Sequence, residues 1–384
     1  MCQIISVVNN WRYFFQHRSH IVECCYSNNY KTFVVGPNDD NNVIKSYNGI
    51  LKNIYPILGN FSFFNVFALF KFLLKTISKE EKTIIHAITL KPILFVLFFR
   101  FFSYFYSNNK NIVYIFTFAG LGHIFSLIAR KNLIGFMRYW LIHIIIFIFL
   151  RGDHIWTTFE TEEDRQTILS ISNLSKINAI LINGTGVDLN LFYPFYSNKN
   201  KPFIVLFAGR MLRSKGIIQY LEVSKILASS DFVFKIAGWE YQSPDGLSPS
   251  ELKLLIDSPT VDFLGFVDDM ATLLRSVDAV VLPSSYPEGI PKIFLEAAAS
   301  GLPIISTDFP GARRVIEDGV TGIIINAPTV EQIADAVLSI YNQPDLGRAM
   351  GEKAHRFIHD GNFSEADIQK QFIAVFERAQ LGDN

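Results

Sequence analysis

The stretch Ser284–Gly301, SSYPEGIPKIFLEAAASG, places two glutamates, Glu288 and Glu296, eight positions apart in the chain. Immediately before it, the apolar run Ala279–Leu282 predicts a buried parallel strand. The composition of the stretch then changes from loop residues to a helical pattern, so we expect the order strand, loop, helix. Glu288 falls in the predicted loop and Glu296 falls on the predicted helix.

The expected start of this helix is suited to binding an anion. Pro291 fits the first helical position, where its missing N–H costs nothing, and Gly301 fits the residue that ends the helix. The backbone N–H groups of residues 289–292 then present the positive end of the helix dipole, which favours phosphate. Glu296 lies about 7.5 Å further along the axis, a distance that suits a ribose diol beside a diphosphate. Glutamates that only complement the helix dipole are the alternative interpretation.

A second element of the same kind lies about eighty residues earlier. The apolar run Phe203–Ala208 is followed by the loop GRMLRSKG and by the helical pattern Ile217–Leu227. Arg210 offers a planar fork and Lys215 a point charge, the two kinds of cation that bind phosphate oxygens. Taken alone, this loop is better explained as an ordinary solvated turn. Together the two elements predict one diphosphate pocket.

The motifs in the second half of the chain resemble the retaining nucleotide-sugar glycosyltransferases of family 4, which have the fold called GT-B. The resemblance covers residues 183–345 most strongly. It is carried by Gly209-Arg210 with Lys215-Gly216, by the two glutamates Glu288 and Glu296, by PGARRVIEDGVTG at Pro310–Gly322, and by GTGVDLNLFYP at Gly184–Pro194.

The first half resembles a narrower branch of that family, the enzymes that build bacterial surface polysaccharides such as capsule and lipopolysaccharide on lipid carriers. The segments that carry this resemblance are VVNNWRYFFQHR, IIHAITLKP and TFAGLGHIF. It implies transfer of a sugar from a nucleotide sugar, with UDP and an N-acetylhexosamine or hexose as the first expectation. The implied acceptor is a lipid-linked sugar or another saccharide. Where many relatives have glycines in the first loop, this chain has Asn9 and Asn10.

The resemblance also implies a role for each matching residue. The catalytic candidates are Arg210, Lys215, Glu288 and His123. The donor-binding candidates are Gly209, Gly238, Gly265, Phe266, Gly289, Ile290, Pro291 and Glu296, with Trp239 beside them near the nucleobase. On the acceptor side the candidates are His86, Lys91 and Gly122. The sequence lacks the Asp-x-Asp motif and any His/Cys cluster at ligand spacing, so we expect neither a metal nor another cofactor.

Two other classes of protein remain open alternatives. A sugar-nucleotide epimerase of the same architecture needs several acids and histidines that converge on the sugar, and we cannot place such a set in this sequence. A catalytically silent subunit that binds a sugar nucleotide is expected to have lost Arg210, Lys215 or Glu296, yet all three are present. A glycogen-type phosphorylase requires a much longer chain. The residues therefore favour an active transferase.

Apolar runs of strand length alternate with helical patterns along the whole chain, which predicts an α/β fold with parallel sheets. We expect the GT-B architecture, two Rossmann-like domains whose sheets face each other across a cleft. The expected domains are an acceptor-binding domain over residues 1–185 and a nucleotide-sugar-binding domain over residues 186–362. A C-terminal helix over residues 363–384 is expected to pack back on the first domain.

The charge of the chain divides between its halves. Residues 1–190 hold 18 Lys and Arg against 11 Asp and Glu, a balance of +7, which leaves 17 against 24, or −7, for the rest. A basic first half suits the surface of an anionic membrane rather than nucleic acid. Of the 36 phenylalanines, 19 fall within residues 61–160, and Phe61–Leu74 and Pro92–Tyr106 have the composition of interfacial helices. Core helices packed on a sheet are an equally good interpretation of these two segments.

The sequence offers no membrane span and no signal peptide. The longest apolar run, Tyr139–Leu150, is far shorter than the ~20 residues that cross a bilayer, and it predicts a buried helix or strand. Three cysteines, two of them adjacent, form no even disulfide framework and indicate a reducing compartment. We therefore expect a cytoplasmic protein, with peripheral attachment at the inner face of the cell membrane as the further expectation.

Overall fold

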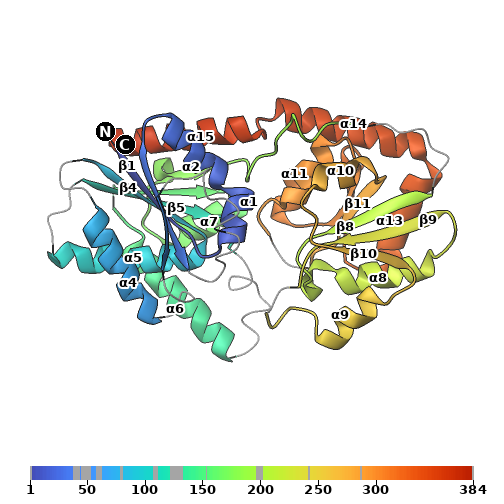
Figure 1. The fold of residues 1–384 in the computed structure, drawn as a ribbon, viewed down its shortest axis with the longest axis horizontal. Helices are drawn as coiled ribbons and strands as arrows, with labels where there is room; N and C mark the ends of the chain where they lie inside the picture. Colours follow the sequence, from blue (N-terminus) through green and yellow to red (C-terminus); the bar gives the residue numbers. More distant parts are fainter. Residues whose placement is uncertain are drawn as a thin grey trace. The chain divides into compact units, whose positions relative to one another are not determined.

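The chain folds into two compact units in a computed structural model, which describes residues 2–37, 44, 53–57, 63–77, 81–106, 111–121, 133–152, 154–195, 202–240, 243–285 and 288–382. Unit 1 consists of Met1–Thr185 together with Glu365–Asn384, and unit 2 is Gly186–Ser364. Each unit is an α/β domain built on a parallel sheet (Figure 1).

Within the described residues, unit 1 holds a seven-stranded parallel sheet in the order β3-β2-β1-β4-β5-β6-β7. Its strands are β1 (Gln3–Val7), β2 (Lys31–Pro37), β3 (Ile54–Ile57), β4 (Thr83–Ile88), β5 (Ile112–Phe118), β6 (Ile155–Phe159) and β7 (Ala179–Leu181). Its helices are α1 (Trp11–His17), α2 (Ser19–Ser27), α4 (Phe63–Thr76), α5 (Leu90–Tyr106), α6 (Leu133–Phe149), α7 (Glu162–Ile171) and α15 (Glu365–Leu381).

Successive residues of the unit 1 strands face opposite sides of the sheet, and both sides are apolar. In β1, Ile5 packs in one hydrophobic cluster with residues of α4, α5, α6 and α7, whereas Ile4 packs in another with residues of α2 and α15. Figure 1 shows the same division, with α4, α5 and α6 on one side of the sheet and α2 and α15 on the other. The sheet is therefore covered on both faces.

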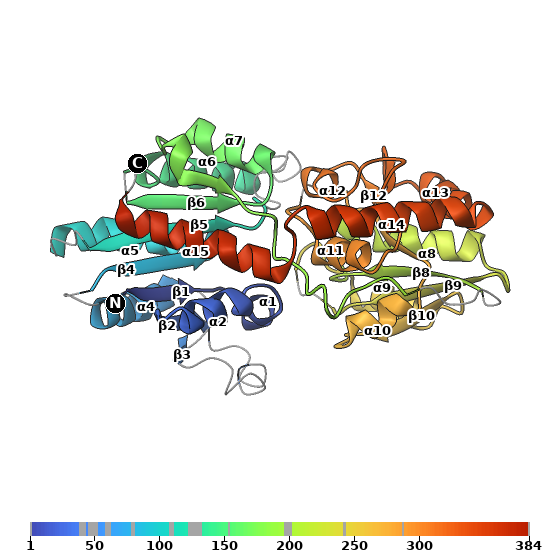
Figure 2. The same cartoon turned by 90° about the horizontal axis from the view of Figure 1, so that it is seen from above.

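Helix α15 supplies a face of this core although it is the last helix described in the chain. Its buried residues, among them Phe372 and Phe376, pack against Ile84 of β4 and Trp156 of β6. Figure 2 shows the helix lying along the unit 1 strands. The chain enters unit 2 beside the point where it leaves, because the Val187 N–H donates to the Phe363 carbonyl at 3.0 Å.

Unit 2 repeats the topology of unit 1 with a six-stranded parallel sheet in its described part, in the order β10-β9-β8-β11-β12-β13. Its strands are β8 (Phe203–Ala208), β9 (Phe232–Ala237), β10 (Val261–Gly265), β11 (Ala279–Leu282), β12 (Ile304–Thr307) and β13 (Gly322–Ile325). Its helices are α8 (Ile217–Ile226), α9 (Pro249–Ile256), α10 (Met270–Arg275), α11 (Lys292–Ala299), α12 (Pro310–Arg313), α13 (Val330–Asn342) and α14 (Pro344–Asp360).

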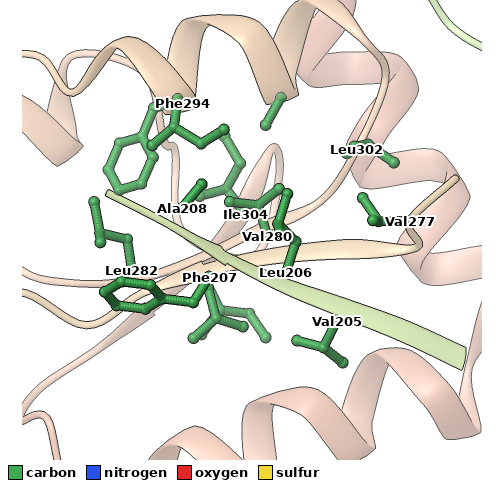
Figure 3. Packing of buried hydrophobic residues seen from close by; sticks show 14 of the residues in the cluster. Val205, Leu206, Phe207, Ala208, Val277, Val280, Leu282, Phe294, Leu302 and Ile304 are labelled. Atoms are coloured by element: carbon green, nitrogen blue, oxygen red, sulfur yellow. The ribbon is translucent and has the colours of Figure 1, made fainter. Parts of the chain in front are cut away.

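The core of unit 2 is formed by the central strands and the helices against them (Figure 3). Phe207 of β8 and Leu282 of β11 are fully buried there, and Phe294 of α11 packs in the same cluster. Continuous apolar strands of this kind are expected where helices cover both faces of a parallel sheet. This rigid core fixes the positions from which the loops after β8 and β11 begin.

The structure corrects three details of the sequence predictions. Strands β3 and β7 were not predicted, because both are short and lie at the two edges of the sheet. Pro291 is the N-cap of α11, with φ −63° and ψ 129°, and the first helical residue is Lys292. The run Tyr139–Leu150, expected to be buried, lies in α6 except for its last residue, and one side of that helix is exposed.

Across the described part of the chain, the structure has no helix that is both long and apolar enough to cross a membrane.

Candidate functional site

The predicted phosphate-binding loops meet at the point in unit 2 where the strand order reverses. Strand β8 pairs on one side with β9 and on the other with β11, so the chain winds in opposite directions from this position. In doubly wound sheets, ligands bind at the carboxyl ends of the strands at such a switch point. The loop that begins at Gly209 follows β8, and the loop that contains Glu288 follows β11. Lys215 and Glu288, which are 73 positions apart in the sequence, are thereby brought together.

The centre of this site is an ion pair between the two loops. Lys215 Nζ lies 2.7 Å from Glu288 Oε2, and the side chains are only 8% and 12% exposed. Each charge offsets the other in a place where an isolated charge would be expensive. The two residues were predicted to bind different parts of a ligand, whereas the structure pairs them with each other.

Glu288 is held at its second oxygen as well. The Ser284 hydroxyl donates to Glu288 Oε1 at 2.8 Å, and Ser284 is buried. The Thr307 hydroxyl at the end of β12 donates in turn to the Ser284 carbonyl. The carboxylate is therefore fixed at both oxygens, with the lysine on one and a hydroxyl on the other.

The Lys215 loop is anchored by an acid that the sequence predictions missed. Asp245 accepts hydrogen bonds from the Ser214 N–H at 3.2 Å and from the Ser214 hydroxyl, and its carbonyl accepts from the Arg213 N–H at 2.9 Å. The Ser285 N–H donates to the Ser214 carbonyl at 2.6 Å. In sequence, Asp245 lies in Ser-Pro-Asp-Gly, which signals only a turn. No local pattern links it to a loop thirty residues earlier.

The carboxyl ends of β8, β9 and β10 approach closely through three predicted donor-binding glycines. The Gly209 N–H donates to the Ala237 carbonyl at 3.0 Å, and the Gly238 N–H donates to the Gly265 carbonyl at 2.7 Å. A Cβ on Gly238 would lie 1.9 Å from the Gly209 carbonyl oxygen, and its φ is +155°, so only glycine fits there.

Two aromatic residues extend this edge. Trp239 follows β9 and Phe266 follows β10, and their rings meet edge to face at 5.6 Å between centroids. Phe266 is 39% exposed, which leaves part of an aromatic surface beside the glycines. A surface of this kind suits a flat ring such as a nucleobase.

The start of α11 is positioned by close backbone packing. A Cβ on Gly311 would lie 1.8 Å from the Gly289 carbonyl oxygen and 2.9 Å from that of Glu288, so glycine at 311 allows the two loops to touch. Ile290 is buried and Pro291 caps the helix without a side-chain hydrogen bond. The first amides of α11 are therefore not capped by the side chain of the residue that begins the helix.

Glu296 lies on α11 as predicted, with its side chain 12% exposed and its Oε1 4.0 Å from Lys292 Nζ. Arg210 is half-buried in the loop after β8. The structure thus gathers Gly209, Arg210, Lys215, Glu288, Gly289 and Glu296 at the carboxyl side of β8 and β11, where the sequence predicts them.

The acceptor-side candidates of unit 1 are not brought together in the described part of the structure. His86 is buried in β4, between the rings of Phe372 and Phe376 at 5.6 and 5.5 Å, and its Nε2 lies 2.7 Å from the Thr117 hydroxyl. Burial lowers the pKa of its imidazole to about 3, and the charge of Arg18 acts in the same direction. Lys91 is exposed in the first turn of α5. Gly122 and His123 lie outside the described residues.

Comparison with solved structures identifies the class of fold. Sucrose-phosphate synthase from Thermosynechococcus elongatus matches with a TM-score of 0.77 at 17% identity, over 98% of this chain and 99% of that one. HepE of Anabaena in complex with UDP and glucose matches with a TM-score of 0.74 at 14% identity, over 98% and 99%. The fold is GT-B, and the predicted pair of Rossmann-like domains with parallel sheets is confirmed.

Residues 193–357 match the family described as "Glycosyl transferases group 1". The capsular polysaccharide biosynthesis glycosyltransferase CapM of Staphylococcus aureus is 24% identical over 53% of this chain and 57% of that protein. The N,N'-diacetylbacillosaminyl-diphospho-undecaprenol alpha-1,3-N-acetylgalactosaminyltransferase of Campylobacter jejuni is 26% identical over 52% and 54%. The chain spans about half the length of the curated relatives it matches. These matches support a GT-B glycosyltransferase.

Proposed function

We propose that this protein transfers a sugar from a nucleotide sugar to a lipid-linked sugar acceptor, with retention of the anomeric configuration, as a member of family 4. The observation that carries the proposal is the Lys215–Glu288 ion pair at the switch point, directly beside the start of α11. Its cation, the guanidinium of Arg210 and the first amides of α11 are the groups that stabilise a departing diphosphate.

When the donor binds, its diphosphate replaces Glu288 as the ion-pair partner of Lys215. Glu288 is then released from its ion pair but keeps the hydrogen bond from Ser284, so it can accept hydrogen bonds from hydroxyls of the donor sugar. Glu296 accepts from the ribose hydroxyls, and the nucleobase lies near Trp239 and Phe266. Stabilisation of the leaving group by fixed charges in a dry site is usually the largest catalytic contribution.

Cleavage of the sugar–phosphate bond leaves positive charge on the anomeric carbon and negative charge on the diphosphate. In the proposed reaction the acceptor hydroxyl attacks from the face that the diphosphate leaves, and a diphosphate oxygen takes its proton. This route requires no separate base. Because Arg210, Lys215 and the amides supply the positive charge, we propose that it also proceeds without a metal.

The donor and the acceptor belong to the proposal as well. UDP is favoured because the HepE structure holds UDP and glucose on the same fold. A hexose or N-acetylhexosamine and a polyprenyl-diphosphate-linked acceptor are favoured because the names of CapM and of the Campylobacter enzyme describe capsule synthesis and transfer of N-acetylgalactosamine to a diphospho-undecaprenol-linked sugar. Unit 1 then binds the acceptor at the inner leaflet of the cell membrane, from the cytoplasmic side.

The test is to incubate the purified protein with a panel of nucleotide sugars and a lipid-linked sugar acceptor. Release of nucleoside diphosphate identifies the donor, and NMR of the product gives the configuration of the new bond. We expect one UDP-sugar to be consumed only when the acceptor is present, with its configuration kept. An inverted product would refute retention, whereas conversion of the donor to another UDP-sugar without transfer would show an epimerase.

A further inference from the structure

Helix α6 presents a continuous apolar surface to the solvent. Nine of its large hydrophobic residues are exposed, including Leu141 at 60% and Trp140 at 45%. They recur at helical spacings of three, four and seven, so they share one side of the helix. We call this side the α6 face; it consists of Leu133, Ile134, Phe136, Met137, Trp140, Leu141, Ile144, Phe147 and Ile148.

The opposite side of α6 is apolar too, and it packs against the core of unit 1. Ile142, Ile145 and Ile146 are buried in the unit 1 core. A surface helix of a globular protein normally places charged and polar residues opposite its buried stripe. On α6 the outer side has hydrophobic residues instead, and contiguous exposed apolar surface of this kind marks a site of interaction with a protein or a membrane.

The helix is held along the body of unit 1. Arg100 of α5 donates to the Phe149 carbonyl at 3.1 Å and to the Arg151 carbonyl at 3.0 Å, which ties down the last turn of α6. Figure 1 shows α4 and α5 on the same side of the sheet as α6. These neighbours add exposed apolar residues of their own, namely Phe67, Leu74, Phe101 and Phe102.

The charged residues of α4, α5 and α6 are all cations, whereas acids enter this side of unit 1 with Glu162, Glu163 and Asp164 in the first turn of α7. No Asp or Glu occurs from Lys82 to Gly152, whereas this segment contains eight cations. Of these eight, Arg138 is exposed on α6 and Arg151 just after it. Lys71 and Lys75, which precede this segment, are two further exposed cations on α4. A lipid surface with anionic headgroups attracts such cations while its acyl chains accept apolar side chains. A second protein surface complementary to this region would need both acids and a large apolar patch.

We propose that the α6 face is the surface by which unit 1 docks on an anionic lipid monolayer, with the axis of α6 in the plane of the interface. The helix has 17 residues, about 25 Å at the usual rise, while a bilayer core is about 30 Å thick. Its packed side and its Arg100 anchor keep it on unit 1. Trp140 lies within the exposed surface, and tryptophan favours the headgroup level of a membrane.

This inference deepens the proposed function, since a lipid-linked acceptor lies in such a monolayer, but it is measured without any transfer reaction. The probe is sedimentation with vesicles of phosphatidylglycerol and phosphatidylcholine, compared with vesicles of phosphatidylcholine alone. The test variant is Leu141→Glu with Ile144→Glu. The matched control is Ile226→Glu with Leu254→Glu, which places two acids at apolar residues of unit 2 that are 64% and 68% exposed.

We expect the wild type and the control variant to sediment with the anionic vesicles, and the Leu141/Ile144 variant to bind at least about tenfold more weakly. All four residues are exposed, so the thermal unfolding of each variant should match that of the wild type. Binding of the α6 variant equal to that of the control overturns the proposal. So does a wild type that ignores vesicles but forms a dimer that the α6 variant lacks, because the face is then an interface between two copies of the chain.

A second readout locates the contact. Brominated lipids quench tryptophan in the acyl region. Trp11 and Trp156 are buried, and Trp239 is half-buried in unit 2, so we expect quenching in the wild type that the Trp140→Phe variant largely loses. Quenching that persists in this variant would place the contact elsewhere. If vesicle binding fails while a water-soluble acceptor is still glycosylated, the docking surface is refuted and the transferase stands. If the protein binds vesicles but consumes no donor, the docking surface stands and the proposed transferase is refuted.

Discussion

Units 1 and 2 share one strand order, and each contains a buried ion pair, but the surroundings of the two pairs differ. In unit 1, Arg18 Nη2 lies 2.5 Å from Glu160 Oε1, and the same guanidinium donates to the Gly184 carbonyl at 3.1 Å and lies over the Phe372 ring at 5.9 Å. In unit 2, Lys215 and Glu288 meet between two loops beside glycines. The unit 1 pair is enclosed by packed side chains and stabilises the fold, whereas the unit 2 pair joins two loops beside glycines, where we propose that the diphosphate replaces Glu288 as the partner of Lys215.

The largest effect is expected from Lys215→Ala. If this lysine neutralises the departing diphosphate, turnover should fall about 1,000-fold, or ~4 kcal/mol of transition-state stabilisation. The variant should still fold, but its free energy of unfolding should also fall, because the Glu288 carboxylate loses its buried partner. Lys225→Ala is the matched control, because that lysine is half exposed on α8 and forms an ion pair with Glu222 one turn away on the same helix. Near-normal turnover of Lys215→Ala with the matching donor would place the diphosphate elsewhere.

The unit 1 pair should behave in the opposite way. Arg18→Met leaves the Glu160 carboxylate buried without its partner, so we expect the free energy of unfolding to fall by about 3–4 kcal/mol in denaturant titrations. The double variant Arg18→Met with Glu160→Leu removes both charges and should recover most of this loss. No recovery would mean that the hydrogen bond to Gly184, rather than charge compensation, dominates.

The buried His86 of unit 1 should make the stability of the protein depend on pH. Its pKa is about 3 in the folded protein against an ordinary value near 6.5, so the unfolded chain binds the proton more tightly. The stabilisation is complete above pH 6.5 and is lost as the pH falls, by about 1.4 kcal/mol per pH unit. The stability of the His86→Leu variant should therefore depend less steeply on pH between 6.5 and 5. Replacing the exposed His359 of α14 by Leu serves as the comparison, and an equal slope for both variants would contradict this assignment.

The smallest effect is expected from Ser284→Ala. Its hydroxyl holds one oxygen of Glu288 at 2.8 Å, and loss of such a bond costs about 1 kcal/mol, or roughly fivefold in turnover. Ser339→Ala, in which a helix hydroxyl that bonds its own turn is removed, should leave turnover unchanged. An unchanged rate for Ser284→Ala would show that turnover does not depend on the hydrogen bond from Ser284 to Glu288.

In unit 2 the sequence predicts the strands that carry the candidate site, and the candidate residues come directly after those strands. The runs Phe203–Ala208 and Ala279–Leu282 coincide with β8 and β11, and parallel strands bring the residues that follow them to one edge. Asp245 and Ser284 were not predicted as parts of the site, because their roles depend on contacts between loops that no periodicity encodes.

In unit 1 the sequence is a poorer guide. The motif around His86 indicates an acceptor site, yet the residue is buried beneath α15, which comes from nearly three hundred positions later. The apolar run in α6 indicates burial, yet only half of the helix is covered. In both cases the decisive fact is which other segment covers the residue, and that is settled by packing of the whole unit.

Because α15 packs on unit 1 but is synthesised last of the described helices, it affects how the protein folds during translation. The strands of unit 1 emerge first, but one face of their sheet, which includes Ile84 and Trp156, is covered only in part by α2 until α15 is synthesised. Unit 2, whose residues are continuous, can close its core while its neighbour waits. Unit 2 can therefore complete its fold before unit 1, although unit 1 begins to be translated first. Until α15 is made, the nascent unit 1 exposes apolar surface and is the more prone to aggregate.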